Sequence, residues 1–222
     1  MDEGRLVETR VKGVFWDGER LLTRNSAPGT RVYGERLFDF QGVEYREWSP
    51  SRSKLGAYLR LGGLSCPIGE GSRVLYLGAA SGTTASHVAD IACRGTVYCV
   101  EISPRSFRDL VKVCESRRNM VPVLGDATRP QEYSFLVERA DVVYQDIAQK
   151  GQAAIFIKAM RAFGAGAGML SIKARSEDVT REPSEVFQEA KGLLLREGLE
   201  VRDLMDLSPF EKDHAMIVVG RT

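Results

Sequence analysis

The sequence predicts an α/β protein in which a largely parallel sheet follows a small β-rich segment. From residue 73 onward, short apolar runs alternate with amphipathic helical patterns, as parallel strands and their crossover helices do. Over residues 1–48, apolar and polar residues instead alternate in short stretches separated by DG, NSAPG and QG turns, which is typical of antiparallel strands. We therefore expect a small antiparallel β domain over residues 1–50 and an α/β domain over residues 51–222.

The elements of the expected α/β domain follow one another in a regular order. SRSKLGAYLRLGG (51–63) predicts a helix that a serine caps and two glycines end. Seven strands are predicted at RVLYLG, GTVYCVEI, MVPVLGD, DVVYQDI, GMLSIKA, LEVRDLMDL and HAMIVVG, and helices at 83–93, 105–118, 130–139, 151–163 and 183–197. The last two strands lie too close in sequence for a helical crossover, so they should pair antiparallel.

Composition and charge narrow the class of protein. The 31 basic and 30 acidic residues give a net charge of +1, whereas proteins that bind nucleic acid alone usually have a larger basic excess. Any grip on RNA or DNA must come from clustered cations or from partners. No apolar run approaches the roughly 20 residues that span a bilayer, and MDEGRLVETR lacks the apolar segment of a signal peptide. We expect a cytoplasmic protein with no membrane partner.

The cysteines predict no metal site and no redox pair. The chain has four cysteines, and none of them forms a CxxC pair. Cys93, Cys99 and Cys114 lie in apolar stretches, where free cysteine usually packs as a small hydrophobic residue.

The stretch YLGAASGTTASHVAD (76–90) forms the first strand-to-helix turn of the α/β domain. In an open α/β sheet, ligands bind beyond the carboxyl ends of the strands, and small residues there let a ligand approach the backbone. The helix that follows offers free N–H groups at its first turn. The turn is not GxGxxG and lacks the GK[ST] ending of a P-loop, which disfavours a triphosphate ligand.

Carboxylates end the next three strands. Glu101 follows the turn by about 20 residues, where an acidic side chain can accept hydrogen bonds from both ribose hydroxyls of an adenosine. Asp126 can accept from the adenine amine, and Asp146 ends the fourth strand. Any one of these carboxylates alone would be expected to cap a helix. Together they predict an adenosine-bearing cofactor without a pyrophosphate cradle, S-adenosylmethionine rather than NAD.

Six ordered motifs give the sequence a family resemblance. VLYLGAASGTTASHVAD, VYCVEISPRS, PVLGDATRPQEY, DVVYQDIAQ, SIKARSEDVT and PFEKDHAMIVVG resemble the fibrillarin family, in its archaeal form, from about residue 45 to the end. The resemblance implies a class I methyltransferase domain, Rossmann-like, with seven strands and an antiparallel last strand. It implies methyl transfer from S-adenosylmethionine to a ribose 2′-hydroxyl of rRNA or tRNA that a box C/D guide RNA selects. The implied protein partners are a Nop-family scaffold and a kink-turn-binding ribosomal-type protein.

The resemblance also assigns residues to the cofactor. The expected set combines the turn residues with the family's contacts: Gly78, Ala79, Ser81, Thr83, Thr84, Glu101, Ile102, Asp126, Ala127, Asp146, Ile147, Ala148 and Gln149. Two departures from the family pattern are visible. Gln145 stands where an acidic residue is common, and SPSRSKLGAYL differs slightly around its lysine.

A catalytic set follows from the same resemblance. The family's Lys-Asp-Lys-His residues map onto Lys54, Asp146, Lys173 and His214. A ribose hydroxyl is a poor nucleophile, so its reaction needs proton removal and in-line placement. Lys173 would orient or deprotonate the hydroxyl, with the charge of Lys54 lowering its pKa. Asp146 would hold the lysine, and His214 would position the nucleotide or relay the proton. The sequence leaves the division of these roles open.

Two sets of basic residues could contact RNA. A phosphate-following surface is one interpretation of Arg46, Arg52, Lys54 and Arg60 near the domain junction, and of Arg105, Arg108, Lys112, Arg117 and Arg118 along one helix, although the second set equally fits a solvated helix face. His87 is expected to pack or cap rather than react.

Two alternative functions remain open. One is an enzyme of the same fold with another methyl acceptor, protein glutamine or a small molecule, and the other is a non-catalytic assembly subunit.

Overall fold

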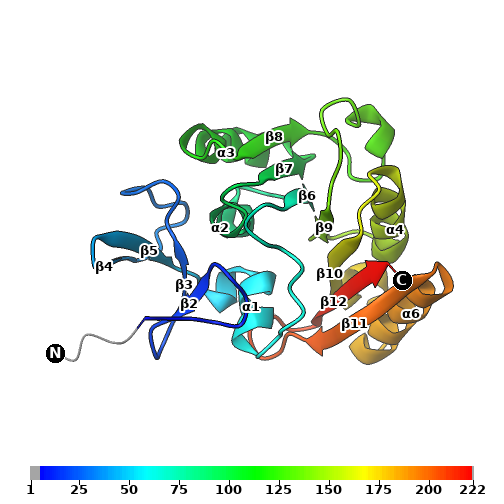
Figure 1. Ribbon diagram of the computed structural model, residues 1–222. Helices are drawn as coiled ribbons and strands as arrows, with labels where there is room; N and C mark the ends of the chain where they lie inside the picture. The colour runs from blue at the N-terminus through cyan, green and yellow to red at the C-terminus, as the bar shows by residue number, and fades with distance from the viewer. Residues whose placement is uncertain (1–5, 222) are drawn as a thin grey trace.

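The computed structural model describes residues 6–221, which form two β-sheets beside each other (Figure 1). The first residues of MDEGRLVETR, on which the signal-peptide prediction partly rests, lie outside this range. In the part of the chain that the structure describes, no helix is long and apolar enough to cross a membrane.

The small sheet has five strands in the order β1-β2-β3-β5-β4. Its strands are β1 (Val7–Glu8), β2 (Val14–Trp16), β3 (Leu21–Arg24), β4 (Leu37–Phe40) and β5 (Val43–Glu47). Every pair is antiparallel, as the alternating pattern predicted. In the QG turn between β4 and β5, Gln41 and Gly42 both have positive φ, 55° and 79°, which two-residue hairpins require.

The large sheet has seven strands in the order β11-β12-β10-β9-β6-β7-β8. They are β6 (Arg73–Leu77), β7 (Thr96–Glu101), β8 (Met120–Leu124), β9 (Val142–Gln145), β10 (Ala167–Lys173), β11 (Leu199–Asp206) and β12 (His214–Arg221). β12 runs antiparallel to both of its neighbours, β10 and β11, and the other pairs are parallel, which confirms the prediction for the last pair. The sheet order changes direction at β6, so the strand ends beside β6 form the crevice where α/β proteins bind ligands.

Helices cover both faces of the large sheet. On one face lie α1 (Lys54–Arg60), α2 (Thr83–Ile91) and α3 (Pro104–Ser116), and on the other α4 (Gln152–Ala162) and α6 (Pro183–Arg196). Along β6 the side chains alternate between these two cores, with Val74 and Tyr76 in the first and Leu75 and Leu77 in the second. Figure 1 shows α1 between the small sheet and β12.

Two predicted helices differ from the structure. The helix expected at 51–63 consists of a 3₁₀ turn, Pro50–Arg52, and α1, because Ser53 is extended and caps α1 by accepting from the Gly56 N–H at 3.1 Å. The helix expected at 130–139 is wrong. Only Pro130–Glu132 forms a 3₁₀ turn, and the following residues close tight i→i+3 turns that bury Tyr133 and leave Phe135 78% exposed. A short helix, α5 (Ala174–Glu177), was not predicted.

A buried charge cluster joins the small sheet to α2. Arg46 pairs with Glu35 and Asp90 at 2.7 Å each, and all three side chains are buried. The Arg117 guanidinium, also fully buried, donates to Asn25 Oδ1 at 3.1 Å. The prediction that Arg46 and Arg117 belong to phosphate-following basic sets is therefore wrong, because neither side chain reaches the surface.

His87 and three of the cysteines differ in how far they are buried. His87 packs as predicted: its ring stacks on Trp48 with centroids 4.7 Å apart and is fully buried. Cys99 is buried and Cys114 is partly buried, but Cys93 is exposed at the end of α2, so the prediction that it packs as a hydrophobic residue is wrong.

Candidate active site

A cavity of about 250 Å³ lies at the carboxyl ends of β6, β7, β8 and β9. Nine of the residues expected to bind a cofactor line it: Gly78, Glu101, Ile102, Asp126, Ala127, Asp146, Ile147, Ala148 and Gln149. The sequence did not single out three further lining residues, Ala80, Val100 and Gly125, although each adjoins a motif residue.

The first turn of the cavity requires glycine. Gly78 has φ of 81°, and a Cβ at this position would lie 2.2 Å from the carbonyl oxygen of Asp146. The Asp146 N–H in turn donates to the Leu77 carbonyl at 2.9 Å. The ends of β6 and β9 therefore meet in backbone contact, and only a residue without a side chain fits between them.

The carboxylates of Glu101 and Asp126 are held by hydrogen bonds. Glu101 accepts from the Ala80 N–H at 2.8 Å and from the Ser103 N–H at 2.7 Å, one on each oxygen. Asp126 accepts from the N–H and hydroxyl of Thr128, both at 2.8 Å, and these bonds lower the pKa of its carboxyl. Since a carboxylate has about four lone-pair sites, both groups keep acceptor capacity for a ligand.

An apolar side chain stands at the rim of this cavity. Ile102 is 62% exposed, directly after the buried Glu101. A flat, weakly polar group placed against Ile102 would remove apolar surface from water, which is favourable. The acceptors and Ile102 thus offer a polar and an apolar contact to one ligand.

Four expected cofactor residues lie outside the cavity lining: Ala79, Ser81, Thr83 and Thr84. Ala79 is buried, while Ser81 and Thr83 line a neighbouring hollow. The buried Thr84 hydroxyl donates to Ser53 Oγ at 3.0 Å. Since Ser53 caps α1, this bond connects the start of α2 to the start of α1.

Lys54 and Asp146 form an ion pair at the edge of the cavity. Lys54 Nζ lies 3.1 Å from each carboxylate oxygen of Asp146, and each side chain is 21% exposed. Lys54 is the first residue of α1, directly after the Ser53 cap, so the cap and its Thr84 contact fix where the lysine begins. Two residues far apart in sequence are thereby paired in the structure.

Lys173 and His214 meet at the ends of neighbouring strands. They are direct register partners in the antiparallel pairing of β10 with β12. His214 Nδ1 lies 2.7 Å from the carbonyl oxygen of Lys212, so Nδ1 carries the proton and donates. Burial lowers the pKa of His214, and the nearby charge of Lys54 lowers it further. In the neutral ring, Nε2 is then free to accept.

Sequence reasoning missed one residue that holds this site together. The Gln152 side chain accepts from the Lys173 N–H at 2.9 Å and donates to the Lys173 carbonyl at 3.1 Å. Gln145, the departure from the family pattern, is buried and donates to the Gln152 carbonyl at 2.7 Å instead of facing the cavity. No local pattern marks Gln152, because its contact with Lys173 spans 21 residues.

Known proteins resemble this chain in sequence and in fold. A model of the family described as Fibrillarin matches residues 6–222. The chain belongs to the fibrillarin family. A relative from Thermococcus gammatolerans, named fibrillarin-like rRNA/tRNA 2'-O-methyltransferase, is 53% identical over 206 residues, which cover 91% of each chain.

Two solved fibrillarin structures share the whole architecture. Aeropyrum pernix fibrillarin, solved with natively bound S-adenosyl-L-methionine, is 49% identical and superposes with a TM-score of 0.88 over 97% of each chain. A fibrillarin/Nop5p complex contains a chain that is 38% identical, with a TM-score of 0.89 over 97% of this chain and 100% of that one. The expected fold, a class I methyltransferase domain preceded by a β-rich segment, is confirmed.

Proposed function

We propose that this fibrillarin-family chain is an S-adenosylmethionine-dependent enzyme that methylates a ribose 2′-hydroxyl of rRNA or tRNA under the direction of a guide RNA. One observation carries the proposal. Asp146 lines the cavity and is also the ion-pair partner of Lys54, so the ligand cavity and the Lys54–Asp146 ion pair share one side chain. An acceptor next to that side chain would lie beside whatever the cavity binds.

The cavity fits S-adenosylmethionine on its own chemistry. The fixed Glu101 carboxylate suits ribose hydroxyls, Asp126 suits the adenine amine, and Ile102 offers an apolar surface to the adenine ring. Asp146 and the backbone of Ile147–Gln149 would contact the remainder of the cofactor. When bound, the cofactor supplies an electrophilic methyl group on a positively charged sulfur. We propose the nine lining residues as the cofactor set on these grounds. For Ala79, Ser81, Thr83 and Thr84, which lie outside the lining, the proposal rests on the family resemblance.

The chain's own residues would prepare the ribose hydroxyl. Lys173 would orient or deprotonate the hydroxyl from the end of β10, where Gln152 fixes the backbone of this lysine and the strand lies beside β9. Lys54, held by Asp146, places a positive charge at the edge of the cofactor cavity. His214, neutral and with a free Nε2, accepts a hydrogen bond from the target nucleotide. Positioning of the ribose hydroxyl and removal of its proton are the two things that methyl transfer to a poor nucleophile requires.

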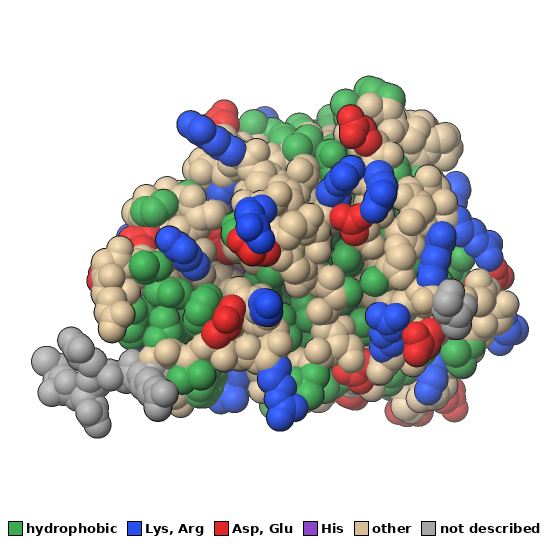
Figure 2. Space-filling view, in the orientation of Figure 1, with side chains coloured by type: hydrophobic (Ala, Val, Ile, Leu, Met, Phe, Trp, Pro, Cys, Tyr) green, Lys and Arg blue, Asp and Glu red, His purple; other side chains and the backbone are tan. Residues whose placement is uncertain are grey.

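The proposed partners follow from charge and from a relative. Figure 2 shows basic and acidic side chains intermingled over one face of the molecule, in keeping with the net charge of +1. Such a surface grips RNA weakly by itself. We therefore propose a Nop-family scaffold protein, as in the related fibrillarin/Nop5p complex, together with a box C/D guide RNA and a kink-turn-binding ribosomal-type protein. The assembly would act in the cytoplasm.

The test is transfer of labelled methyl from S-adenosylmethionine to an RNA paired with a box C/D guide. It is run with and without the partners for the parent chain, Lys173→Ala and the control Lys191→Ala, which replaces a lysine of α6 away from the cavity. We expect label at one ribose, dependent on guide and partners, and a 10²–10⁴-fold slower transfer for Lys173→Ala alone. Cofactor binding with no transfer in the complete mixture would instead establish an assembly subunit or another acceptor.

A further inference from the structure

A second hollow, of about 440 Å³, lies where the small sheet meets the cofactor turn. Its lining includes Arg31, Tyr33, Arg52, Ser81, Thr83 and Lys112, and we name it the junction hollow. These residues come from the loop before β4, the 3₁₀ turn before α1, the start of α2 and the exposed side of α3. The function proposed above assigns nothing to Arg31, Tyr33, Arg52 or Lys112.

The charge of the junction hollow is positive. Three cations line it and only one carboxylate, that of Asp109, which pairs with Lys112 at 3.1 Å. The Arg52 guanidinium lies 5.5 Å from the centre of the Tyr33 ring and has no hydrogen bond or ion pair with the described residues. Arg31 donates its Nε to the Glu35 carbonyl at 3.1 Å, which leaves its Nη groups for a ligand. The hollow is therefore suited to an anion.

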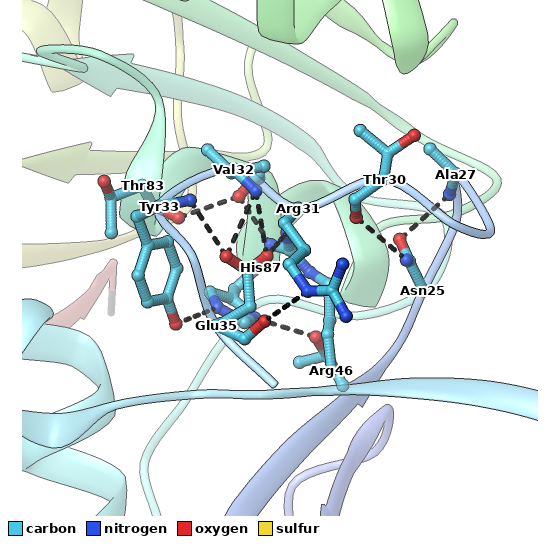
Figure 3. Close-up of polar contacts among 12 residues, drawn as sticks. Asn25, Ala27, Thr30, Arg31, Val32, Tyr33, Glu35, Arg46, Thr83 and His87 are labelled. Atoms are coloured by element: carbon cyan, nitrogen blue, oxygen red, sulfur yellow. Dashed lines mark hydrogen bonds and ion pairs between the residues drawn. The ribbon is translucent and has the colours of Figure 1, made fainter. Parts of the chain in front are cut away.

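The wall of the hollow is held rigidly from below. One Glu35 oxygen accepts from the Tyr33 N–H at 2.9 Å, and both accept from the Val32 N–H at 3.1 Å, while the same carboxylate pairs with the buried Arg46. The Tyr33 hydroxyl lies 2.8 Å from both His87 Nε2 and the Glu47 carbonyl. Figure 3 shows this loop fixed over α2. Because the loop is already ordered, binding does not have to pay for ordering it.

Two segments of the chain connect the junction hollow to the proposed active site. Arg52 precedes Lys54 by two residues, so their Cα atoms are at most about 7 Å apart. Ser81 directly follows Ala80, which lines the cofactor cavity, and Thr83 lies two residues further along. A strand whose ribose lies at Lys54 and Asp146 can therefore place a neighbouring phosphate in the hollow.

We propose that the junction hollow binds the phosphate backbone of the target RNA strand next to the acceptor ribose, an inference that rests on the proposed function. Arg31 and Arg52 would contact phosphate oxygens, since a guanidinium donates two parallel hydrogen bonds to phosphate. Tyr33, with Arg52 over its ring, would form an apolar wall to the sugar or base. The near-neutral chain would thus concentrate its grip on RNA at the point where placement of the ribose matters.

The test uses the assembled particle with its guide RNA. The variants are Arg31→Ala, Arg52→Ala and the double variant, and the control is Arg94→Ala, which removes an exposed arginine outside the hollow. We expect each single variant to raise the KM for target RNA about tenfold. The log–log salt dependence of target binding should fall by about one per lost phosphate contact, with cofactor affinity unchanged. Arg52→Lys should restore part of the loss, because it keeps a point charge.

Three results would overturn this proposal while leaving the enzyme intact. In the first, the hollow variants match Arg94→Ala in KM and salt dependence while the parent transfers methyl normally. In the second, they weaken assembly with the scaffold protein but leave the KM for target RNA in the assembled particle unchanged, which would make the hollow a protein interface. In the third, photoreactive nucleotides in the guide strand, and not those in the target strand, crosslink to the hollow. A parent chain that transfers no methyl would instead reject the proposed function itself.

Discussion

Lys54 Nζ lies 3.1 Å from both carboxylate oxygens of Asp146, although 92 residues separate the two in the sequence. The pair is only partly buried, so its value lies less in stability than in position. Asp146 reaches it from the end of β9 and Lys54 from the first turn of α1. The contact therefore joins the cofactor cavity to the helix that precedes the large sheet.

Asp146→Asn should leave the fold intact and slow methyl transfer by about 10²–10³-fold, because a neutral amide no longer holds the Lys54 ammonium by charge. Single-turnover transfer measures the rate, and titration calorimetry measures cofactor affinity. Asp141→Asn, at the opposite end of β9, is the matched control and should transfer normally. Equal rates for the two variants would remove Asp146 from the catalytic set.

Gln152→Leu should destabilise the protein and slow the reaction together. The substitution leaves the N–H and carbonyl of Lys173, a partly buried residue, without their partners, which costs about 2–4 kcal/mol of unfolding free energy. Thermal denaturation should show Tm lower by roughly 5–10 °C. Gln131→Leu, on the exposed turn after β8, is the control and should change little. An unchanged Tm for Gln152→Leu would show that Lys173 does not depend on this side chain.

The stability of the fold should fall as the pH is lowered through about 6.5. Burial, together with the charges of Arg46 and Arg117, holds the pKa of His87 well below its ordinary value, so the unfolded chain takes up this proton first. The free energy of unfolding then decreases by up to about 1.4 kcal/mol per pH unit until the lower folded-state pKa is reached. His214, whose pKa is also lowered, adds a smaller share in the same direction.

Urea unfolding at a series of pH values checks this. His87→Gln should show a shallower slope of unfolding free energy between pH 6.5 and 5 than the parent, whatever its absolute stability. His214→Gln is the companion variant. Since carboxylates contribute equally to all three chains, parallel curves for parent and His87→Gln would contradict the assignment.

Arg46→Ala should cost about 3–5 kcal/mol of unfolding free energy, because it leaves Glu35 and Asp90 as buried charges without their cation. Arg36→Ala, which removes an exposed arginine of the same sheet paired with Glu47, should change stability little. Urea denaturation compares the two. Loss of RNA affinity by Arg46→Ala without loss of stability would restore the sequence-based interpretation of Arg46 as a phosphate contact.

Local patterns predicted the order of the elements well where one period extends over a whole element. β6 to β12 appear where apolar runs predicted them, and α2, α3, α4 and α6 begin and end within two residues of the predicted ranges. The 130–139 segment failed because its apolar residues divide between core and surface: Tyr133 and Val137 are buried, but Phe135 and Leu136 are exposed. A helical pattern of apolar residues does not distinguish these outcomes.

The sequence by itself determined the α/β order and the antiparallel end of the sheet. It also placed Gly78, Glu101, Asp126 and Asp146 in the cavity, because strand ends of a parallel sheet meet at one edge, while the other five expected lining residues came from the family resemblance. Only the tertiary structure decided which charges are buried and which residues touch. Arg46 and Arg52 look alike in the sequence. Arg46 nevertheless pairs with a buried carboxylate of α2, whereas Arg52 lines the junction hollow. The contact between Gln152 and Lys173 was likewise visible only in the structure, since burial and contact depend on residues brought together from distant parts of the chain.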